Sequence, residues 1–356
     1  MRTLLLLNSP QVRALDGEMA RRAHALAGEG QVEVGFLAGW SSEALFEGMA
    51  VRRFESGEAL RAFLGAERVD AIVACDVPGA FGAIQGARYQ GALIVEVHEI
   101  GPSLATLWEM RGQAAIDGFI VPSQQAAEIV RLELGYDALP VEVVPYGVDI
   151  AALERSRPEV LPERPVILWA GGEAERHNWR GALEIAARVR SGGKDVELWM
   201  LGDGEREDAT FQQMLALVAR DDLADRCRWV APTRPEEMAH YCAAAAAAGG
   251  CHLVTALDAP FPVTAVEAAA CGCPVVAPQG GACAEALEGL AGLYPPTDLR
   301  HAVGLVERAL GDTAERREAV ESARAAVMER YDAGKVAESY GRAIRRIAER
   351  PVSTAE

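Results

Sequence analysis

The chain has 356 residues, of which 50% are apolar and 24% are charged. This length is typical of about two domains, and this composition is that of a globular protein rather than a disordered chain or a small disulfide-stabilised scaffold. The formal net charge is −17, from 35 basic and 52 acidic residues. Such an acidic protein is not expected to bind nucleic acid non-specifically.

Short apolar strands alternate with amphipathic helical stretches along the whole chain. This alternation predicts parallel sheets made of βαβ units, and therefore an α/β fold. In the first half we expect a strand over 3–8, a loop through Gly17 and a helix over about 18–27. Further strands are expected at 32–37, 71–75, 92–97, 118–121 and 141–144.

A second series of the same kind follows an exposed linker that is rich in Arg and Pro, around 155–165. The linker places the domain boundary near residue 155, with one domain over 1–154 and the other over 155–334. The last helix, about 335–349, has apolar residues at helical spacing and is expected to pack back on the first domain. The strands expected in the second domain lie at 166–170, 196–201, 227–230, 251–255 and 274–277. Two doubly wound domains in tandem predict a ligand-binding cleft between the carboxyl ends of their sheets.

The cysteines and the apolar segments point to a reducing cytoplasm. None of the seven cysteines has the paired Cys-x-x-Cys spacing of a structural zinc site. The apolar run at 3–7 is too short for the core of a signal peptide. The most apolar stretch, 241–257, contains Gly249-Gly250 and His252, so we interpret it as the end of a helix followed by a buried strand, with no transmembrane segment.

The stretch from 257 to 277 is the most informative part of the sequence. It contains a Pro-rich turn, a helix that begins near Thr264, and a second buried strand. The amides at the start of such a helix are suited to bind a phosphate. Because the prolines of the turn lack an amide hydrogen, Phe261, Val263 and Thr264 would have to supply these contacts.

This stretch resembles the signature of retaining glycosyltransferases of family 4, also called group 1, in which two Glu residues precede an Ala-rich helix and a Gly-x-Pro-Val-Val strand. Glu267 matches the second Glu. The resemblance implies that Glu267 holds the ribose hydroxyls of a nucleotide sugar through charge-assisted hydrogen bonds. An alternative interpretation of Thr264 and Glu267 is a capping box, in which the carboxylate only bonds the backbone of Thr264.

Other segments resemble the same family in the same order. Asp16-Gly17-Glu18 is similar to its first glycine loop, which faces the acceptor and the donor phosphates, and 143–149 is similar to the turn that ends its first domain. Gly202 lies in a segment that resembles the family's loop that lines the nucleotide pocket. Val230 lies where the backbone of the family's members contacts the base of the nucleotide. The segment 280–285 resembles the family's Gly-Gly-x-x-Glu loop. The resemblance implies the GT-B fold, two doubly wound Rossmann-like domains that face each other across a cleft.

The resemblance also implies a mechanism. Members of the family transfer sugar with retention, and in the usual proposal the leaving diphosphate takes the acceptor proton, so that no protein nucleophile, metal or other cofactor is needed. The family stabilises the diphosphate with an Arg and a Lys after the first strand of the second domain. Here Gly172 occupies the Arg position, and we interpret Arg180, and then Arg176, as the diphosphate ligands. The alternative for both is a solvated charge on a helix surface.

Two more positions carry predicted roles. The family's first Glu falls on Ala259, so the neighbouring Asp258 is the candidate to contact the hydroxyls of the donor sugar. His98 ends a predicted strand where the family often places a His beside the reacting sugar. It would donate a hydrogen bond to that sugar or orient the acceptor, and the alternative is a structural histidine.

The sequence therefore predicts a metal-independent retaining glycosyltransferase, with a UDP- or GDP-sugar as donor and a sugar, a lipid-linked glycan or a small molecule as acceptor. A catalytically silent GT-B binding or regulatory subunit is the alternative, favoured by the missing Arg, Lys and first Glu. A third interpretation is a sugar-nucleotide epimerase that would recruit Asp258 and Glu285 as acid and base. The family's glycine turns fit this third interpretation poorly.

Overall fold

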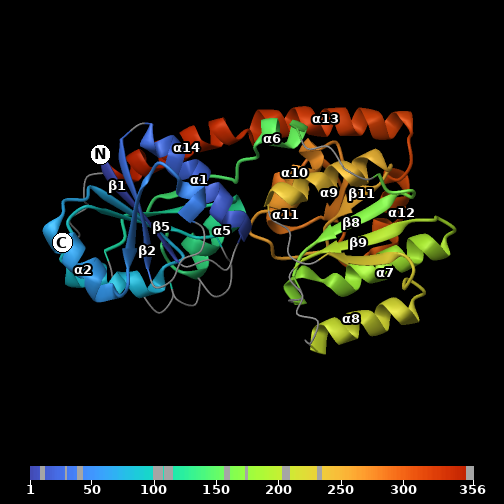
Figure 1. Ribbon diagram of the computed structural model, residues 1–356, viewed down its shortest axis with the longest axis horizontal. Helices are drawn as coiled ribbons and strands as arrows, with labels where there is room; N and C mark the ends of the chain where they lie inside the picture. The colour runs from blue at the N-terminus through green and yellow to red at the C-terminus, as the bar shows by residue number, and fades with distance from the viewer. Residues whose placement is uncertain are drawn as a thin grey trace. The chain divides into compact units, whose positions relative to one another are not determined.

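The computed structural model describes residues 1–8, 13–28, 30–37, 43–98, 107, 115–155, 161–172, 175–202, 209–230 and 235–349. The chain forms two compact units, which are described separately (Figure 1). Unit 1 contains Met1–Gly147 and Ala333–Glu356, and unit 2 contains Val148–Asp332. The chain thus enters unit 2 before the linker near residue 155, because the short helix α6 (Ile150–Arg155) already belongs to unit 2.

Unit 1 is built on a sheet of seven parallel strands in the order β3-β2-β1-β4-β5-β6-β7. The strands are β1 (Arg2–Asn8), β2 (Gln31–Leu37), β3 (Ala50–Phe54), β4 (Ala71–Cys75), β5 (Ala92–Glu96), β6 (Gly118–Val121) and β7 (Val141–Val143). The apolar strands β4 and β6 are buried along their whole length, as is typical of a parallel sheet that is covered on both faces.

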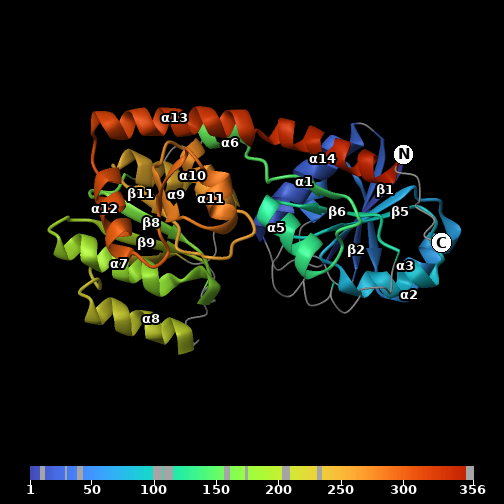
Figure 2. The same ribbon diagram turned by 180° about the vertical axis from the view of Figure 1, so that it is seen from behind.

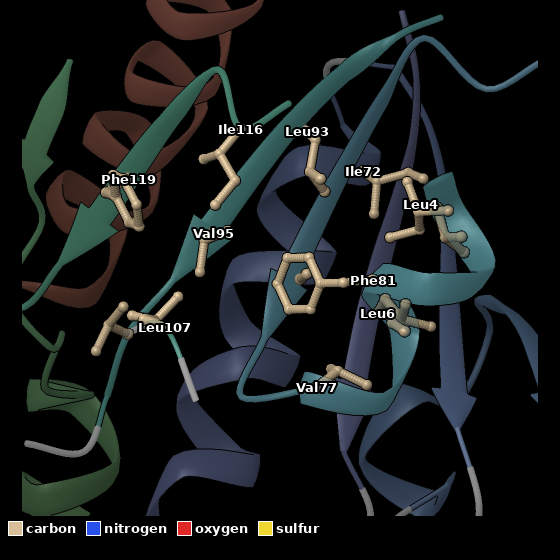
Figure 3. Packing of buried hydrophobic residues seen from close by; sticks show 14 of the residues in the cluster. Leu4, Leu6, Ile72, Val77, Phe81, Leu93, Val95, Leu107, Ile116 and Phe119 are labelled. Carbon is tan, nitrogen blue, oxygen red and sulfur yellow. The ribbon is translucent and has the colours of Figure 1, made fainter. Parts of the chain in front are cut away.

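Helices cover both faces of this sheet. They are α1 (Arg13–Ala27), η1 (Glu43–Phe46), α2 (Gly57–Ala66), η2 (Pro78–Ala80), α3 (Phe81–Gly86), α5 (Gln124–Glu128), the π-helical turn η3 (Ile129–Glu133) and α14 (Ala333–Ala348). Because successive side chains of a strand point to opposite faces, Leu4 and Leu6 pack with α2 and α3, whereas Leu5 packs with α1 and α14. Figure 3 shows the first of these clusters, with Phe81 of α3 beside Leu6. The last helix therefore completes the core of unit 1.

Unit 2 is built on six parallel strands in the order β10-β9-β8-β11-β12-β13. The strands are β8 (Val166–Ala170), β9 (Glu197–Leu201), β10 (Cys227–Val230), β11 (Cys251–Leu253), β12 (Val275–Pro278) and β13 (Ala291–Tyr294). Besides α6, the helices are η4 (Glu175–His177), α7 (Trp179–Ser191), α8 (Ala209–Arg220), α9 (Pro235–Ala247), α10 (Val263–Ala270), α11 (Gly281–Leu287), α12 (Leu299–Ala309) and α13 (Ala314–Arg330). Helices α7 and α12 pack together on one face of the sheet, and α13 packs on α10 (Figure 2).

The predicted α/β class and the predicted strands are confirmed, with three differences. The edge strands β3 and β13 were not predicted. Helix α1 begins at Arg13, so Gly17 lies inside this helix and not in the loop that the sequence predicts. Although glycine costs a helix about 1 kcal/mol, the carboxylate of Glu18 pairs with Arg21 at 2.8 Å and with Arg22 at 2.7 Å, which supports this part of α1.

Two further observations concern thiols and membranes. All seven cysteines lie in the described part of the chain, and none of them forms a disulfide there. Among the helices within the described ranges, none has the length and apolar character needed to cross a membrane.

Candidate functional site

Each sheet has one point at which the chain reverses the direction of strand addition. In unit 1 this switch point lies between β1 and β4, and in unit 2 it lies between β8 and β11. In open α/β sheets, ligands bind beyond the carboxyl ends of the strands at such a point, because the flanking loops run apart there. The switch points therefore define where a site is expected in each unit.

The carboxyl edge of the unit 2 sheet brings together most of the residues predicted from the sequence. Gly172 follows β8, Gly202 follows β9, and Val230 ends β10. Strand β11 pairs with β8 at the switch point, and its loop leads into α10. The other predicted residues at this edge are Arg176, Arg180, Asp258, Phe261, Val263, Thr264 and Glu267.

Two glycines allow the loops after β8 and β9 to touch. The amide of Gly171 donates to the carbonyl of Leu201 at 2.9 Å. A Cβ on Gly202 would lie only 1.7 Å from the carbonyl oxygen of Gly171, and a Cβ on Gly171 would lie 2.8 Å from the ring of Trp169. Real atoms cannot approach so closely, so this edge of the sheet requires glycine at both positions.

A buried threonine ties the loop after β8 to the loop after β11. The hydroxyl of Thr255 accepts from Nε1 of Trp169 at 2.8 Å and donates to the carbonyl of His177 at 2.8 Å. Asn178 then caps α7, accepting from the amide of Gly181 at 3.2 Å, and holds a left-handed backbone with φ of 50°. Thr255 was not predicted, because its partners Trp169 and His177 are far from it in the sequence.

The start of α10 differs from a capping box. The helix begins at Val263, and its cap position is occupied by Pro262, whose side chain makes no capping hydrogen bond. The hydroxyl of Thr264 lies 3.4 Å from Nε2 of His252 instead. Thr264 thus lies inside α10 and not at its cap position, and the half-buried carboxylate of Glu267 stands one turn into the helix, where its role stays a prediction.

Phe261 and Val263 are already engaged within the turn before α10. The amide of Val263 donates to the carbonyl of Phe261 at 3.0 Å, so a phosphate contact by this amide would have to replace that bond. The ring of Phe261 is buried and meets the ring of Tyr331 edge-on, with centroids 5.5 Å apart. Asp258 is exposed in the same loop.

His252, whose ring lies next to the hydroxyl of Thr264, is a buried and neutral group. Burial lowers the pKa of His252 to about 4, so the ring carries no charge at neutral pH. Its Nδ1 has no hydrogen-bond partner within the described ranges. No motif in the sequence indicated a role for this residue, although its position in an apolar strand indicated that it is buried.

The two predicted cations lie on the segment after β8. Arg180 is exposed, donates to Oε1 of Gln213 on α8 at 2.6 Å, and lies over the ring of Trp179 at 4.1 Å. Arg176 is exposed in η4. The contacts of Arg180 are those of a helix-surface residue, so its role as a diphosphate ligand stays a prediction, as does that of Arg176.

Unit 1 carries a buried cluster of charges at the carboxyl edge of its sheet. The side chains of Arg22 and Glu18 are only 1% and 3% exposed and pair at 2.7 Å, and Arg22 also pairs with Glu96 at the end of β5. The hydroxyl of Tyr340 on α14 donates to Oε2 of Glu96 at 2.6 Å. Burial alone would raise the pKa of Glu96, but its contacts with His98 and Arg22 hold this pKa below its usual range.

His98 lies beside this cluster, just after β5. Its Nδ1 is 2.7 Å from the hydroxyl of Tyr146, and its Nε2 is 3.0 Å from Oε1 of Glu96. The donor atoms of Cys75, Glu96 and His98 lie within 4.8 Å of one another, a spacing that a metal could use. However, Arg22 already pairs with Glu96 and would repel a cation there, so the group is better explained as an ion-pair network.

Two doubly wound parallel sheets, each with a switch point, define the class of the protein as the GT-B fold. Residues 20–152 match the model of Glycosyltransferase Family 4, and residues 164–312 match that of Glycosyl transferases group 1. The chain belongs to the group 1 glycosyltransferases with the GT-B fold. The fold and the family inferred from the sequence are thereby confirmed.

Solved structures agree with this fold over nearly the whole chain. Sucrose-phosphate synthase from Thermosynechococcus elongatus has 18% identity and a TM-score of 0.77, over 98% of this chain and 99% of that one. HepE from Anabaena, solved with UDP, has 17% identity and a TM-score of 0.76, over 97% and 100%. A glycosyltransferase from Rickettsia africae has 12% identity and a TM-score of 0.80, over 98% and 99%.

One curated relative is similar in sequence over part of its length. The D-inositol 3-phosphate glycosyltransferase of Corynebacterium jeikeium is 30% identical over 208 residues, which are 53% of this chain and 48% of that protein. The match thus spans about half the length of this relative.

Proposed function

We propose that the protein is a glycosyltransferase that moves a sugar from a nucleotide sugar to an acceptor. The observation that carries this proposal is the switch point of unit 2, where the loops after β8, β9 and β11 and the start of α10 hold the predicted nucleotide-sugar residues. The nucleotide would lie at this edge, with its ribose hydroxyls on the carboxylate of Glu267. The proposal is supported by the position of Thr264, which lies inside α10 and not at the cap position that a capping box with Glu267 would need.

The donor is proposed to be a UDP-sugar. Structures of HepE from Anabaena contain UDP, or UDP-glucose, and this protein shares their fold over 97% of its chain. A GDP-sugar is the other donor that the sequence resemblance allows. For the acceptor, the classes to screen are sugars, lipid-linked glycans and small molecules.

The transfer is proposed to proceed with retention and without a metal or other cofactor. The bond from the anomeric carbon to the diphosphate breaks, the acceptor oxygen bonds to the same face of that carbon, and the diphosphate takes the acceptor proton. The protein must then stabilise the departing charge. Arg176 and Arg180 after β8 and the amino end of α10 would do so, because Gly172 contributes no charge. Asp258 would contact the donor sugar, and His98 would donate to it.

A second candidate function is a silent binding or regulatory subunit. It is favoured by the contacts of Arg180, which donates to Gln213 at 2.6 Å, and by Ala259 at the position of the family's first Glu. Under this alternative the nucleotide binds without turnover. Binding and turnover are therefore measured separately.

Calorimetric titration tests the site first. The full chain is titrated with UDP, GDP, ADP and their sugar conjugates, with a chelator present, and we expect UDP to bind. Glu267→Ala should weaken this binding about 10- to 100-fold, because a hydrogen bond to a charged group contributes about 1.5–3 kcal/mol. The matched control is Glu307→Ala, which removes another half-exposed carboxylate from a unit 2 helix and should leave the affinity unchanged.

The outcomes separate the hypotheses. An unchanged affinity in Glu267→Ala would refute the ribose assignment, and failure of every nucleotide to bind would refute the donor site. If a nucleotide sugar binds, its hydrolysis or transfer is followed by NMR, which also reports the anomer of the product. Binding without turnover in an acceptor screen would favour the silent subunit, and an inverted anomer would refute the retaining mechanism.

A further inference from the structure

His98 and Tyr146 share a buried polar contact that the proposed mechanism has not used. Tyr146 lies between β7 and the end of the first segment of unit 1, and its hydroxyl is 2.7 Å from Nδ1 of His98. The two side chains are buried, and their rings are 5.4 Å apart between centroids. Either the tyrosine hydroxyl or Nδ1 is the donor of this hydrogen bond. If the hydroxyl donates, Nδ1 accepts and the ring proton of a neutral imidazole is on Nε2; if Nδ1 donates, the ring proton is on Nδ1.

Several groups fix the direction of this hydrogen bond. Burial raises the pKa of Tyr146 well above its usual value, so the hydroxyl keeps its proton at neutral pH and can donate it. On the other side of the ring, Oε1 of Glu96 lies 3.0 Å from Nε2 and favours a proton on that nitrogen. This Nε2 is buried. A proton on Nε2 is thus stabilised by the nearby charge of Glu96.

The backbone around Tyr146 is held in place by α1. Arg22 donates to the carbonyls of Val144 at 3.3 Å and of Pro145 at 2.8 Å. The amide of Gly147 donates to Oε2 of Glu18 at 3.2 Å. Because bonds on both sides of Tyr146 lead to α1, the backbone that carries its side chain is held beside His98.

We propose that Tyr146 is a positioning residue for His98. Its hydroxyl donates to Nδ1, and this bond keeps the ring proton of His98 on Nε2, facing Glu96, so that the ring has one tautomer and one orientation for the proposed contact with the donor sugar. The part concerning the sugar rests on the proposed function, whereas the assignment of the tautomer does not.

The tautomer is tested by NMR of the full chain with 15N-labelled histidine. The signals of His98 are assigned by their loss in His98→Gln. At neutral pH we expect a proton on Nε2 and an acceptor-type Nδ1 in the wild type, and a shift toward the other tautomer in Tyr146→Phe. A wild-type proton on Nδ1, or an unchanged His98 spectrum in Tyr146→Phe, would overturn the assignment. If this variant does not fold, the wild-type spectrum decides alone.

The matched control is Tyr136→Phe. Tyr136 is half-buried in the same unit, and its hydroxyl donates to the carbonyl of Leu107 at 3.3 Å. Its replacement removes the hydroxyl of a half-buried tyrosine without touching His98, so the His98 signals should stay in place. A change of equal size in the His98 signals of Tyr136→Phe would show that these signals respond to any loss of packing in unit 1, and would overturn the inference.

The consequence for catalysis is measured with the nucleotide sugar that calorimetry identifies. We expect Tyr146→Phe to lower kcat about tenfold with the KM for the donor and the affinity for UDP unchanged, because the proposed nucleotide contacts lie in unit 2. A wild-type kcat in a variant with an altered tautomer would overturn the positioning role. If no nucleotide sugar is turned over by the wild type, the proposed function fails while the tautomer assignment is still decided by the spectra.

Discussion

The carboxyl edges of the two sheets are stabilised in different ways. In unit 1, Glu18, Arg22 and Glu96 form a buried ion-pair cluster. In unit 2, the corresponding edge depends on a close glycine contact and on neutral hydrogen bonds through Thr255. Even its buried histidine, His252, is uncharged at neutral pH.

This difference has a physical consequence. A buried ion pair is costly to break, because the remaining charge stays in a medium that solvates it poorly. The loss of a hydrogen bond between neutral groups costs less free energy. Such groups also carry no net charge that would weaken the binding of an anion. Among the described residues, the edge proposed to bind a diphosphate thus has no buried ion pair, whereas the edge that holds His98 has a fixed charge environment.

Removal of the charge of Arg22 should have the largest effect. Arg22→Met leaves the carboxylates of Glu18 and Glu96 buried without their shared partner, so we expect the free energy of unfolding to fall by about 3–5 kcal/mol. Urea denaturation measures this loss. The second substitution Glu96→Gln, made in the Arg22→Met background, should recover part of it, since it removes one uncompensated charge.

An exposed ion pair provides the control for Arg22. Arg188 and Glu184 pair on the surface of α7 in unit 2, and Arg188→Met should cost about 0.5 kcal/mol or less. Equal losses in the two variants would contradict the view that burial makes the unit 1 cluster important.

The second prediction concerns acid and His252. Between its unfolded pKa of about 6.5 and its folded pKa of about 4, only the unfolded chain takes up the proton. The free energy of unfolding should therefore fall as the pH drops through this window, by about 3 kcal/mol in total. His252→Phe should lose this part of the pH dependence in denaturation curves measured from pH 7 to pH 4.

The control for acid sensitivity is an exposed histidine of the same unit. His301→Phe on α12 should keep the slope of the wild type, because this side chain is exposed. A His252→Phe curve with the wild-type slope would mean that the acid sensitivity of unit 2 has another origin.

The sequence predicted the parts of the fold that depend on local pattern. Strands β4 and β6 are short apolar runs, and their bounds were predicted to the residue. Strand β3 was missed because Arg52 and Arg53, exposed on an edge strand, interrupt its apolar pattern. Gly17 was placed in a loop because its local preference is a turn, whereas ion pairs elsewhere in α1 support a helix.

The site was predictable only where a single segment carries it. The Pro-rich turn with Phe261 and the following helix with Glu267 were predicted as structural elements because their residues are consecutive, and α10 confirms that helix. The pairing of Arg22 with Glu96 joins residues far apart in the chain, and Thr255 joins two loops. Such contacts depend on the order of the strands, which the sequence pattern does not specify.

The smallest effect is expected at the glycine contact of unit 2. Gly202→Ala would place a Cβ 1.7 Å from the carbonyl oxygen of Gly171, so the loops after β8 and β9 must move apart. We expect a loss of about 1–3 kcal/mol, the usual cost of overpacking, together with weaker binding of UDP in the calorimetric titration. Gly304→Ala is the control, because a Cβ at this position of α12 meets nothing within 4 Å. It should be neutral or stabilise the helix by up to about 1 kcal/mol. If Gly202→Ala lowers stability but leaves UDP binding intact, the contact supports only the fold. The nucleotide would then have to be placed away from the loop after β9, closer to the switch point between β8 and β11.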